Sequence, residues 1–256
     1  MGLSAVVITY NEEARLEKCL RSLSFADEIV VLDSFSTDRT LEIARQFTDK
    51  VGCREFVGFS DQWNAAIAMA TQEWVVIVAA DEIVSDGLAA DIVWAMSNGK
   101  HDAYRMPRST YFLGRRMRYC GWYPDYQLRL VKRSIARIAD RLVHETLDVD
   151  CERGTLKHDL IHHSYATMDD FCRKMVAYAR AGAQQKFSEG RRFHAVDLLN
   201  PGFTFFKMYV IKQGFRDGLH GLVLSVLAGC SSALRYAILW DLGLHEARGK
   251  ERNDAI

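Results

Sequence analysis

The sequence lacks the short motifs that identify several common classes of protein. Its six cysteines form no CxxC pair, which argues against a zinc ribbon or a disulfide framework and favours a reduced, cytoplasmic compartment. The motif GxGxxG, the motif GxxxxGK followed by Ser or Thr, and the motif GxSxG are all missing. A standard dinucleotide site, a P-loop and a hydrolase nucleophile elbow are therefore disfavoured. No RNA-binding motif is present either, so we expect no nucleic-acid partner.

The N-terminus lacks the basic segment and long apolar core of a secretory signal, and residues 3–10 suit a first strand instead. An apolar content of 49% with 26% charged residues is ordinary for a folded protein of 256 residues. The net charge is zero, but the first 100 residues hold 8 basic and 16 acidic side chains, whereas the remainder holds 25 and 17. This asymmetry suggests two surfaces with different partners.

Strand-like and helix-like segments alternate through the first hundred residues. Short runs rich in Val and Ile predict strands, and amphipathic stretches between them predict helices. The alternation predicts βαβ units in an α/β fold with a mostly parallel sheet. Beyond residue 99 the pattern changes to short strands and loops, and from Met168 onward it becomes helical. The predicted strands are 3–10, 27–33, 51–57 and 73–80, and the predicted helices are 11–23, 36–47 and 60–71.

Acidic side chains stand where three of the predicted strands end. Glu12 follows the first strand, Asp33 ends the second, and Asp81 and Glu82 follow the strand at 73–80. Open α/β sheets bind their ligands at the carboxyl edge, and carboxylates there hold ribose hydroxyls or hard divalent cations. Two adjacent carboxylates repel each other unless a cation or a proton lies between them. The alternative is that Asp81 and Glu82 cap the following helix.

Six segments resemble glycosyltransferases. The segments "VVITYNEEARLEKCLRSL", "DEIVVLDSFSTDRTLEIA" and "AADE" occur in the order typical of inverting family 2 glycosyltransferases with the GT-A fold. The later segments "WYPDYQLRLVKR", "VHETL" and "HHSY" resemble the bacterial subgroup that adds a sugar, typically β-glucose, to the inner core of lipopolysaccharide or lipooligosaccharide. The resemblance implies a Rossmann-like GT-A domain over residues 1–165, with a donor-binding half at 1–100 and an acceptor half at 101–165. A helical region at 166–256 would follow.

The same resemblance implies a UDP-sugar donor, a divalent cation (Mg²⁺ or Mn²⁺) and a glycolipid acceptor. Glu145 is the implied catalytic base, and Asp125 is the alternative. The three metal-binding residues would be Asp81, Glu82 and His162, the last of which lies in an HxxxHH pattern that suits a cation or a structural role equally. Ala79, Phe35 and Trp63 stand where the family has an acid, a glycine and often a basic residue. The implied donor-binding residues are Thr9, Tyr10, Glu12, Asp33, Asn64, Ala80 and Asp81.

The C-terminal region combines apolar and aromatic residues with scattered positive charges, among them Lys207, Lys212 and Arg216. This composition favours helices that lie on the inner face of the cytoplasmic membrane without crossing it. The alternatives are that these helices cover the sheet or pair with a second copy of the chain, so a homo-oligomer is possible. Two other functions remain open from the residues: a nucleotidyltransferase, and a degenerate transferase that serves as a membrane-bound binding module.

Overall fold

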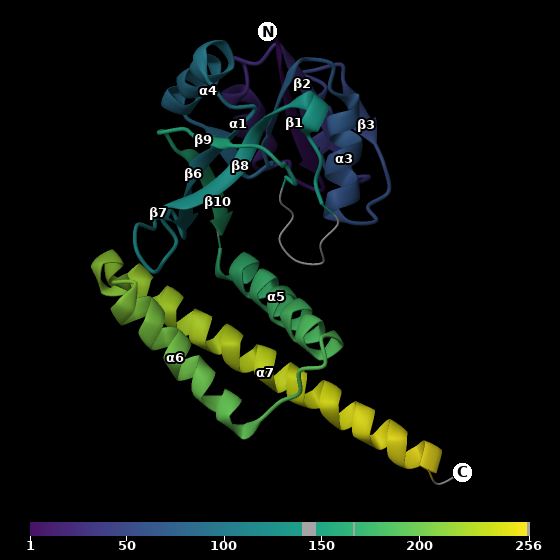
Figure 1. Ribbon diagram of the computed structural model, residues 1–256, viewed down its shortest axis with the longest axis vertical. Helices are drawn as coiled ribbons and strands as arrows, with labels where there is room; N and C mark the ends of the chain where they lie inside the picture. Colours follow the sequence, from purple (N-terminus) through teal and green to yellow (C-terminus); the bar gives the residue numbers. More distant parts are fainter. Residues whose placement is uncertain (140–146, 166, 255–256) are drawn as a thin grey trace. The chain divides into compact units, whose positions relative to one another are not determined.

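The computed structural model describes residues 1–139, 147–165 and 167–254. The chain forms two compact units (Figure 1). The first, which we call the sheet unit, comprises Met1–Thr110 and Pro124–Ser164. The second, which we call the helical unit, comprises Tyr111–Tyr123 and Tyr165–Ile256. The chain thus enters the helical unit twice.

The first half of the sheet unit is built from parallel strands, as the alternating sequence pattern predicts. The strands lie in the order β3-β2-β1-β4, and each neighbouring pair is parallel. Parallel pairing requires a crossover connection, which the three intervening helices supply. The elements in chain order are β1 (Leu3–Thr9), α1 (Leu16–Ser22), β2 (Glu28–Asp33), α2 (Thr40–Ala44), β3 (Val51–Cys53), α3 (Phe59–Met69) and β4 (Trp74–Ile77).

The second half of the sheet is mainly antiparallel, so the sheet as a whole is mixed. The strand β8 pairs antiparallel with both β4 and β6, and β10 pairs antiparallel with β5. The described strands follow the order β3-β2-β1-β4-β8-β6-β10-β5, with β7 and β9 attached to β6. The further elements are β5 (Glu82–Val84), α4 (Asp86–Asn98), β6 (Ala103–Phe112), β7 (Arg115–Arg116), β8 (Asp125–Lys132), η1 (Arg133–Ile135), β9 (Arg153–Thr155) and β10 (Leu160–Tyr165).

A core cluster covers each face of the sheet. Successive side chains of a strand point to opposite faces, so one strand contributes to both clusters. In β1, Leu3, Ala5 and Val7 pack into a core cluster that also holds buried residues of α1 and α4. Val6 points the other way, into a second cluster that includes Trp63 of α3. Burial on both faces explains why the parallel strands are continuously apolar and why the first polar side chains come at their ends.

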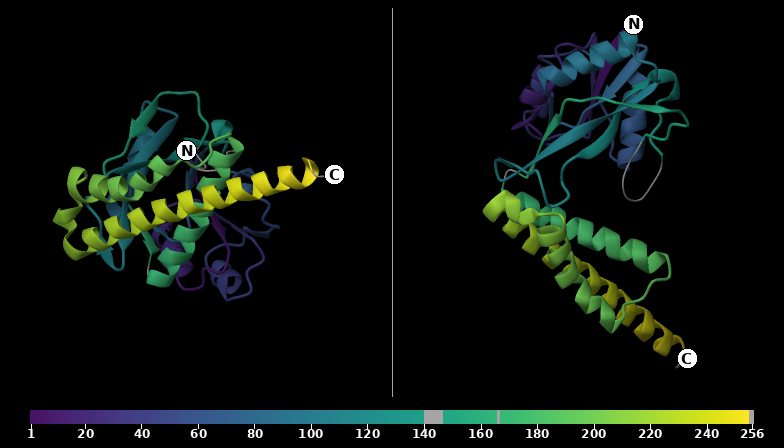
Figure 2. Two further views of the ribbon diagram at one scale, coloured as in Figure 1. Left: turned by 90° about the horizontal axis from the view of Figure 1, so that it is seen from below. Right: turned by 60° about the vertical axis from the view of Figure 1, so that its left-hand side comes forward.

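The helical unit contains the helices predicted from Met168 onward, and in the structure they pack on one long helix. The helices α5 and α6 both lie along α7 (Figures 1 and 2). A small core forms around Phe112, which is fully buried, with Phe171 and Leu224 among its neighbours. Thr167 begins α5 as its N-cap, because its side chain accepts a hydrogen bond from the Asp170 N–H. The elements are α5 (Met168–Ser188), η2 (Ala195–Leu199), α6 (Asn200–Phe206), η3 (Lys207–Ile211, a π-helix), η4 (Gly214–Asp217) and α7 (Gly218–Asp254).

One helical stretch of the described chain, Gly214–Glu246, is long and apolar enough to cross a membrane by length and composition. Its mean hydropathy reaches 1.7, and 28% of that window is buried inside the protein. Core helices of soluble proteins can pass the same test, so the stretch is compatible with a membrane-facing or a packed helix.

Candidate active site

Two loops at the carboxyl edge of the parallel sheet are joined by hydrogen bonds. Thr9 ends β1 beside Asp33 at the end of β2, so the loops that follow leave the sheet together. The Asn11 N–H donates to Ser36 Oγ at 2.8 Å, and the Thr37 N–H donates to Asn11 Oδ1 at 2.9 Å. These contacts hold the two loops as one surface at the sheet edge where open α/β folds bind ligands.

The Asp33 side chain holds these two loops together through hydrogen bonds. Its side chain is fully buried, and its carboxylate accepts hydrogen bonds from Thr9 Oγ1 at 2.8 Å, Ser36 Oγ at 2.6 Å and the Ser36 N–H at 2.7 Å. A buried carboxylate needs such donors to offset its lost hydration. The structure therefore uses Asp33 to shape the loop, and its contact with a uridine stays a prediction, as do those of Thr9 and Glu12.

Two aromatic rings lie exposed on the joined loops. Tyr10 is 60% exposed and Phe35 is 59% exposed. Phe35 has a φ of 61°, in the left-handed region that favours glycine. An aromatic residue thus adopts a conformation that glycine adopts freely, at a cost of about 1–2 kcal/mol. Backbone strain of this kind is concentrated at ligand-binding sites.

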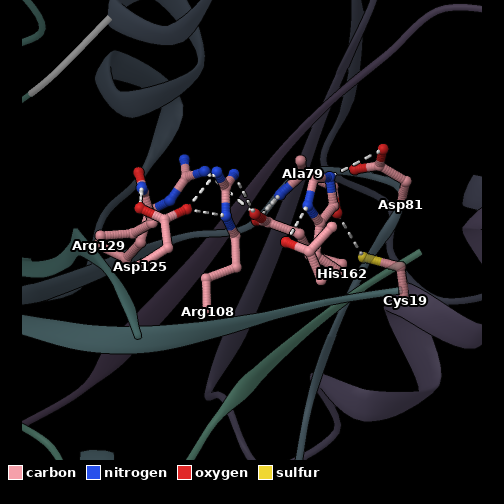
Figure 3. Close-up of polar contacts among 10 residues, drawn as sticks. Cys19, Ala79, Asp81, Arg108, Asp125, Arg129 and His162 are labelled. Carbon is pink, nitrogen blue, oxygen red and sulfur yellow. Dashed lines mark hydrogen bonds and ion pairs between the residues drawn. The ribbon is translucent and has the colours of Figure 1, made fainter. Parts of the chain in front are cut away.

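The paired acids after β4 separate in the structure. The Glu82 N–H donates to the Ala79 carbonyl oxygen at 2.9 Å, which closes a tight turn over residues 79–82. The Glu82 carboxylate folds back and accepts from the Ala79 N–H at 2.9 Å. Cys19 of α1 supports the same turn by donating its thiol to the Ala79 carbonyl at 3.4 Å (Figure 3). Burial, together with the charges of Glu82 and Asp81, raises the pKa of the Cys19 thiol and keeps it protonated as a donor.

Glu82 is fully buried and is matched by two arginines. Arg129 Nη2 lies 3.2 Å and Arg108 Nη1 lies 3.5 Å from Glu82 Oε1. Burial alone would lower the pKa of Arg108, but the nearby charges of Glu82 and Asp125 raise it above its usual value. The charge of Glu82 is therefore offset within the protein, which differs from the metal-ligand role predicted for it from sequence.

Asp81 faces the other way and meets a histidine. Asp81 Oδ2 lies 3.3 Å from His162 Nε2, and His162 Nδ1 lies 3.4 Å from Thr110 Oγ1 (Figure 3). A carboxylate only accepts hydrogen bonds, so this arrangement favours the proton on Nε2 and an Nδ1 that accepts from the Thr110 hydroxyl. The pairing of β5 with β10 produces the contact, since His162 lies opposite Glu82 in the register.

The donor set fits a divalent cation that is completed by a substrate. Among the described residues, no group of three or more His, Cys, Asp or Glu side chains forms a cation site by itself. Asp81 is 14% exposed and lies at the carboxyl edge, with His162 beside it. Mg²⁺ is usually held by one or two carboxylates together with substrate phosphates and water, which is the pattern that Asp81 offers.

Of the two predicted bases, the structure describes Asp125 but not Glu145. Asp125 begins β8, and its carboxylate accepts from Arg108 Nε at 3.0 Å, Arg108 Nη2 at 2.6 Å and Gln127 Nε2 at 2.8 Å (Figure 3). To accept a proton from a substrate, Asp125 would have to keep an oxygen lone pair clear of these donors. Glu145 lies outside the described residues, so its role stays a prediction.

Asn64 has a structural task in the described chain. Its amide donates to the Ile138 carbonyl at 3.0 Å and accepts from the Ile138 N–H at 2.9 Å, so α3 holds the segment that follows η1. Its predicted contact with the nucleotide is not needed to explain the residue. Ala80 is buried at 5% exposure within the turn, where its backbone alone could meet a ligand.

Sequence reasoning missed Arg108 and Arg129, which hold Glu82. A signal was present, because each arginine interrupts an otherwise half-buried strand, and a buried arginine requires an acidic partner. The acid could not be named from sequence, since Glu82 is 26 positions before Arg108 and 47 before Arg129.

Residues 4–136, just over half of the chain, match the sequence model described as Glycosyl transferase family 2. The chain belongs to this glycosyltransferase family. The predicted GT-A fold with a helical C-terminal region and the predicted enzyme class are thereby confirmed. The family also decides against the nucleotidyltransferase alternative.

Relatives of similar length support the assignment. The lipopolysaccharide core biosynthesis glycosyltransferase LpsC of Rhizobium meliloti (strain 1021) is 27% identical over 262 residues, covering 97% of this chain and 95% of that protein. An uncharacterized glycosyltransferase of Rickettsia bellii (strain RML369-C) is also 27% identical, covering 94% and 87%. Among solved structures, the mannosyltransferase PcManGT from Pyrobaculum calidifontis, in complex with GDP-Man and Mn²⁺, is similar in fold. Its TM-score is 0.50 at 17% identity, covering 97% of this chain and 79% of that one.

Proposed function

We propose that this glycosyltransferase moves a hexose, glucose, from a UDP-sugar to a glycolipid acceptor of the lipopolysaccharide core type, with inversion at the anomeric carbon. The observation that carries the donor half of the proposal is the turn at 79–82, which aims Asp81 at the carboxyl edge while Glu82 is held inside. The acceptor half is supported by the likeness to LpsC over nearly the whole of both chains.

The joined loops after β1 and β2 would receive the nucleotide. Tyr10 and Phe35 offer ring faces for stacking on the base, while Thr9, Glu12 and Asp33 fix the loops beneath it. A surface that is already hydrogen-bonded loses little conformational entropy when the nucleotide binds.

Asp81, with His162 supporting it, would hold Mg²⁺ or Mn²⁺ against the donor diphosphate. When bound, the cation would supply positive charge that stabilises the departing nucleoside diphosphate. His162 would orient Asp81 through the Nε2 hydrogen bond, as outer residues commonly orient the groups that bind a metal.

Glu145 would act as the general base. In a direct displacement, the acceptor oxygen forms a bond to the anomeric carbon, and its proton passes to the base carboxylate. The bond between the anomeric carbon and the diphosphate oxygen breaks, and its electron pair leaves with UDP. Asp125 is the competing base, and its carboxylate accepts hydrogen bonds from Arg108 and Gln127.

A donor panel tests the proposal. Purified protein would be incubated with UDP-glucose, UDP-galactose, UDP-N-acetylglucosamine and GDP-mannose, each with core glycolipid and Mn²⁺, and products would be analysed by mass spectrometry and NMR. We expect a β-linked glucosyl product and release of UDP. Transfer from GDP-mannose alone would contradict the UDP-sugar assignment, and an α-linked product would contradict inversion.

We further propose that the helical unit holds the enzyme on the cytoplasmic face of an anionic membrane. Large apolar side chains are exposed along α6, η3 and η4, and Lys207, Lys212 and Arg216 lie among them in sequence. An apolar strip with adjacent positive charge suits an interfacial helix. The exposed apolar residues are Phe203, Phe206, Val210, Ile211 and Phe215.

Vesicle flotation tests the membrane contact. The variant with Phe203, Phe206 and Ile211 changed to Ser removes side chains that are 58%, 49% and 55% exposed. A matched control changes Val93 and Trp94 of α4 to Ser, since these are also exposed apolar residues. We expect the first variant alone to lose flotation, and wild-type binding to weaken in high salt. If concentration-dependent self-association is lost in place of flotation, the strip is an interface between copies of the chain.

A further inference from the structure

The sheet unit contains a cavity of about 360 Å³ on the face of the sheet that carries α3. It is lined by three arginines, Arg105 on β6, Arg129 on β8 and Arg153 on β9, which come from neighbouring strands of the sheet. Trp63 and Tyr126 contribute aromatic walls, and among the described residues of the lining Asp148 is the one that carries an acid. The described lining is therefore partly aromatic and carries more positive than negative charge, although Glu82 offsets the charge of Arg129.

Two of the arginines have no acidic partner in the described part of the chain. Arg105 donates to Thr155 Oγ1 at 2.9 Å and lies over the Tyr126 ring, 4.8 Å from its centroid. Arg153 donates to the Val149 carbonyl at 3.2 Å. Elsewhere in the sheet unit, the half-buried Arg108 is matched by the carboxylates of Glu82 and Asp125. Arg105 and Arg153 are exposed, so their guanidinium groups remain available to a ligand.

Arg129 links the cavity to the candidate active site. Its Nη2 group binds Glu82, whereas its Nε is buried and meets no hydrogen-bond acceptor within the residues that the structure describes. Burying an N–H without an acceptor is unfavourable, so the arrangement suits a ligand oxygen in the cavity. Guanidinium groups bind phosphate and carboxylate through paired N–H donors.

We propose that this cavity binds an anionic group, a phosphate or a carboxylate, carried by the acceptor sugar. The cavity extends to Ile77 at the end of β4, so a sugar anchored there would lie near Asp81, whereas the nucleotide surface lies on the loops after β1 and β2. Tyr126 adds a ring face of the kind that carbohydrates stack on. The inference rests on the proposed function for the identity of the acceptor, but anion binding itself does not require turnover.

Calorimetry on the whole chain tests the cavity with three probes: glucose 6-phosphate, glucuronate and UDP with Mn²⁺. The test variant is Arg105→Gln with Arg153→Gln, and the control is Arg45→Gln, which removes an exposed arginine of the same unit outside the cavity. We expect the test variant to lose roughly tenfold or more in affinity for the phosphate or the carboxylate, because each charge-assisted hydrogen bond contributes strongly. Its affinity for UDP and its melting temperature should match those of the control.

The outcomes separate the alternatives. Tighter binding of glucose 6-phosphate than of glucuronate would assign the cavity to a phosphate, and the reverse would assign it to a carboxylate. A loss of UDP affinity in the test variant would overturn the proposal and assign the arginines to the donor diphosphate. Equal anion binding by wild type and both variants, or none by wild type, would also overturn it. Failure of UDP to bind wild type would count against the proposed function and leave the anion result to be read independently.

Discussion

The two edges of the parallel sheet both hold buried or nearly buried carboxylates, but they use them differently. Where the strands begin, Glu28 accepts from Ser4 Oγ, the Thr71 N–H, Thr71 Oγ1 and Lys50 Nζ. Burial alone would raise the pKa of Glu28, yet the hydrogen bonds from Lys50, Ser4 and Thr71 lower it to about 2. At this edge, the charge of Glu28 is therefore stabilised by hydrogen bonds from the protein itself.

Where the strands end, the acidic groups differ in their exposure and in their partners. Asp33 and Glu82 are fully buried and hold loops or arginines, whereas Asp81 remains partly exposed beside His162. The larger cavity, about 730 Å³, lies at the other edge, beside Glu28. The larger of the two described cavities therefore lies at the opposite edge of the sheet from the candidate site. The carboxylates differ in one property: some are buried and paired with protein groups, whereas Asp81 is partly exposed at the carboxyl edge.

The largest expected effect comes from Asp81. Changing Asp81→Asn should lower turnover by roughly a thousandfold or more, because it removes the charge that would hold the cation but keeps the shape. The melting temperature should stay unchanged. Activity assays with added Mn²⁺ or with chelator, alongside the exposed control Asp86→Asn, would measure this. Full activity in the Asn variant, or in chelator, would show that Asp81 does not hold a cation needed for turnover.

The base should show the next largest effect. Glu145→Gln should lower kcat by roughly 10²- to 10⁴-fold with little change in UDP affinity, since a general base acts mainly in the transition state. Asp125→Asn should have a smaller effect, through Arg108. Steady-state kinetics combined with UDP calorimetry would distinguish the two. If Asp125→Asn has the larger effect and Glu145→Gln is nearly silent, the roles are reversed.

Glu82 should show its effect in stability. Glu82→Gln should lower the free energy of unfolding by about 3 kcal/mol, because two arginines lose the buried charge that matches theirs. Asp125→Asn, which affects the same Arg108 from a position with 35% side-chain exposure, should cost about 1 kcal/mol. Urea unfolding at pH 7 would compare them. A stable, inactive Glu82→Gln variant would instead place Glu82 with Asp81 at the cation.

Glu28 should affect stability without affecting activity. Its pKa of about 2 in the folded protein lies below the ordinary value of 4.5. Its contribution is therefore present above about pH 4.5 and is lost as the pH falls toward 2. Glu28→Gln should cost about 1–3 kcal/mol at pH 7 and progressively less at pH 4 and pH 3. Glu17 forms an exposed ion pair with Arg21 and serves as the control. The free energy of unfolding of Glu17→Gln should stay within about 0.5 kcal/mol of the wild-type value at every pH. A pH-independent loss would contradict the charged role of Glu28.

Phe35 should give the smallest change. Phe35→Gly should raise the free energy of unfolding by about 0.5 kcal/mol, because relief of the left-handed strain exceeds the added flexibility of glycine. The same variant should lose roughly fivefold in UDP affinity as the ring is removed. Phe35→Ala should lose the affinity without the gain in stability. Unchanged UDP affinity in both would show that the ring does not contact the base.

Much of the parallel half of the sheet unit could be predicted from the residues. Continuous apolar strands must be buried on both faces, and their polar ends must meet at one edge, so the clustering of residues after β1, β2 and β4 followed from pattern alone. The antiparallel half was harder, because its strands carry arginines and lie between loops, and the partner of each strand depends on contacts distant in the chain. The long strand β6 was expected only as part of a region of short strands.

The roles of individual acids also depend on contacts between residues that are distant in the chain. That Asp81 and Glu82 lie at the end of a buried strand was determined by the sequence, because strand length and polarity are local properties. Which of the two faces the edge and which is buried was decided by the tertiary structure. The turn at 79–82, the arginines of β6 and β8, and His162 of β10 meet there only after folding, and charge pairing between such distant groups depends on distance in space, not on spacing in the chain.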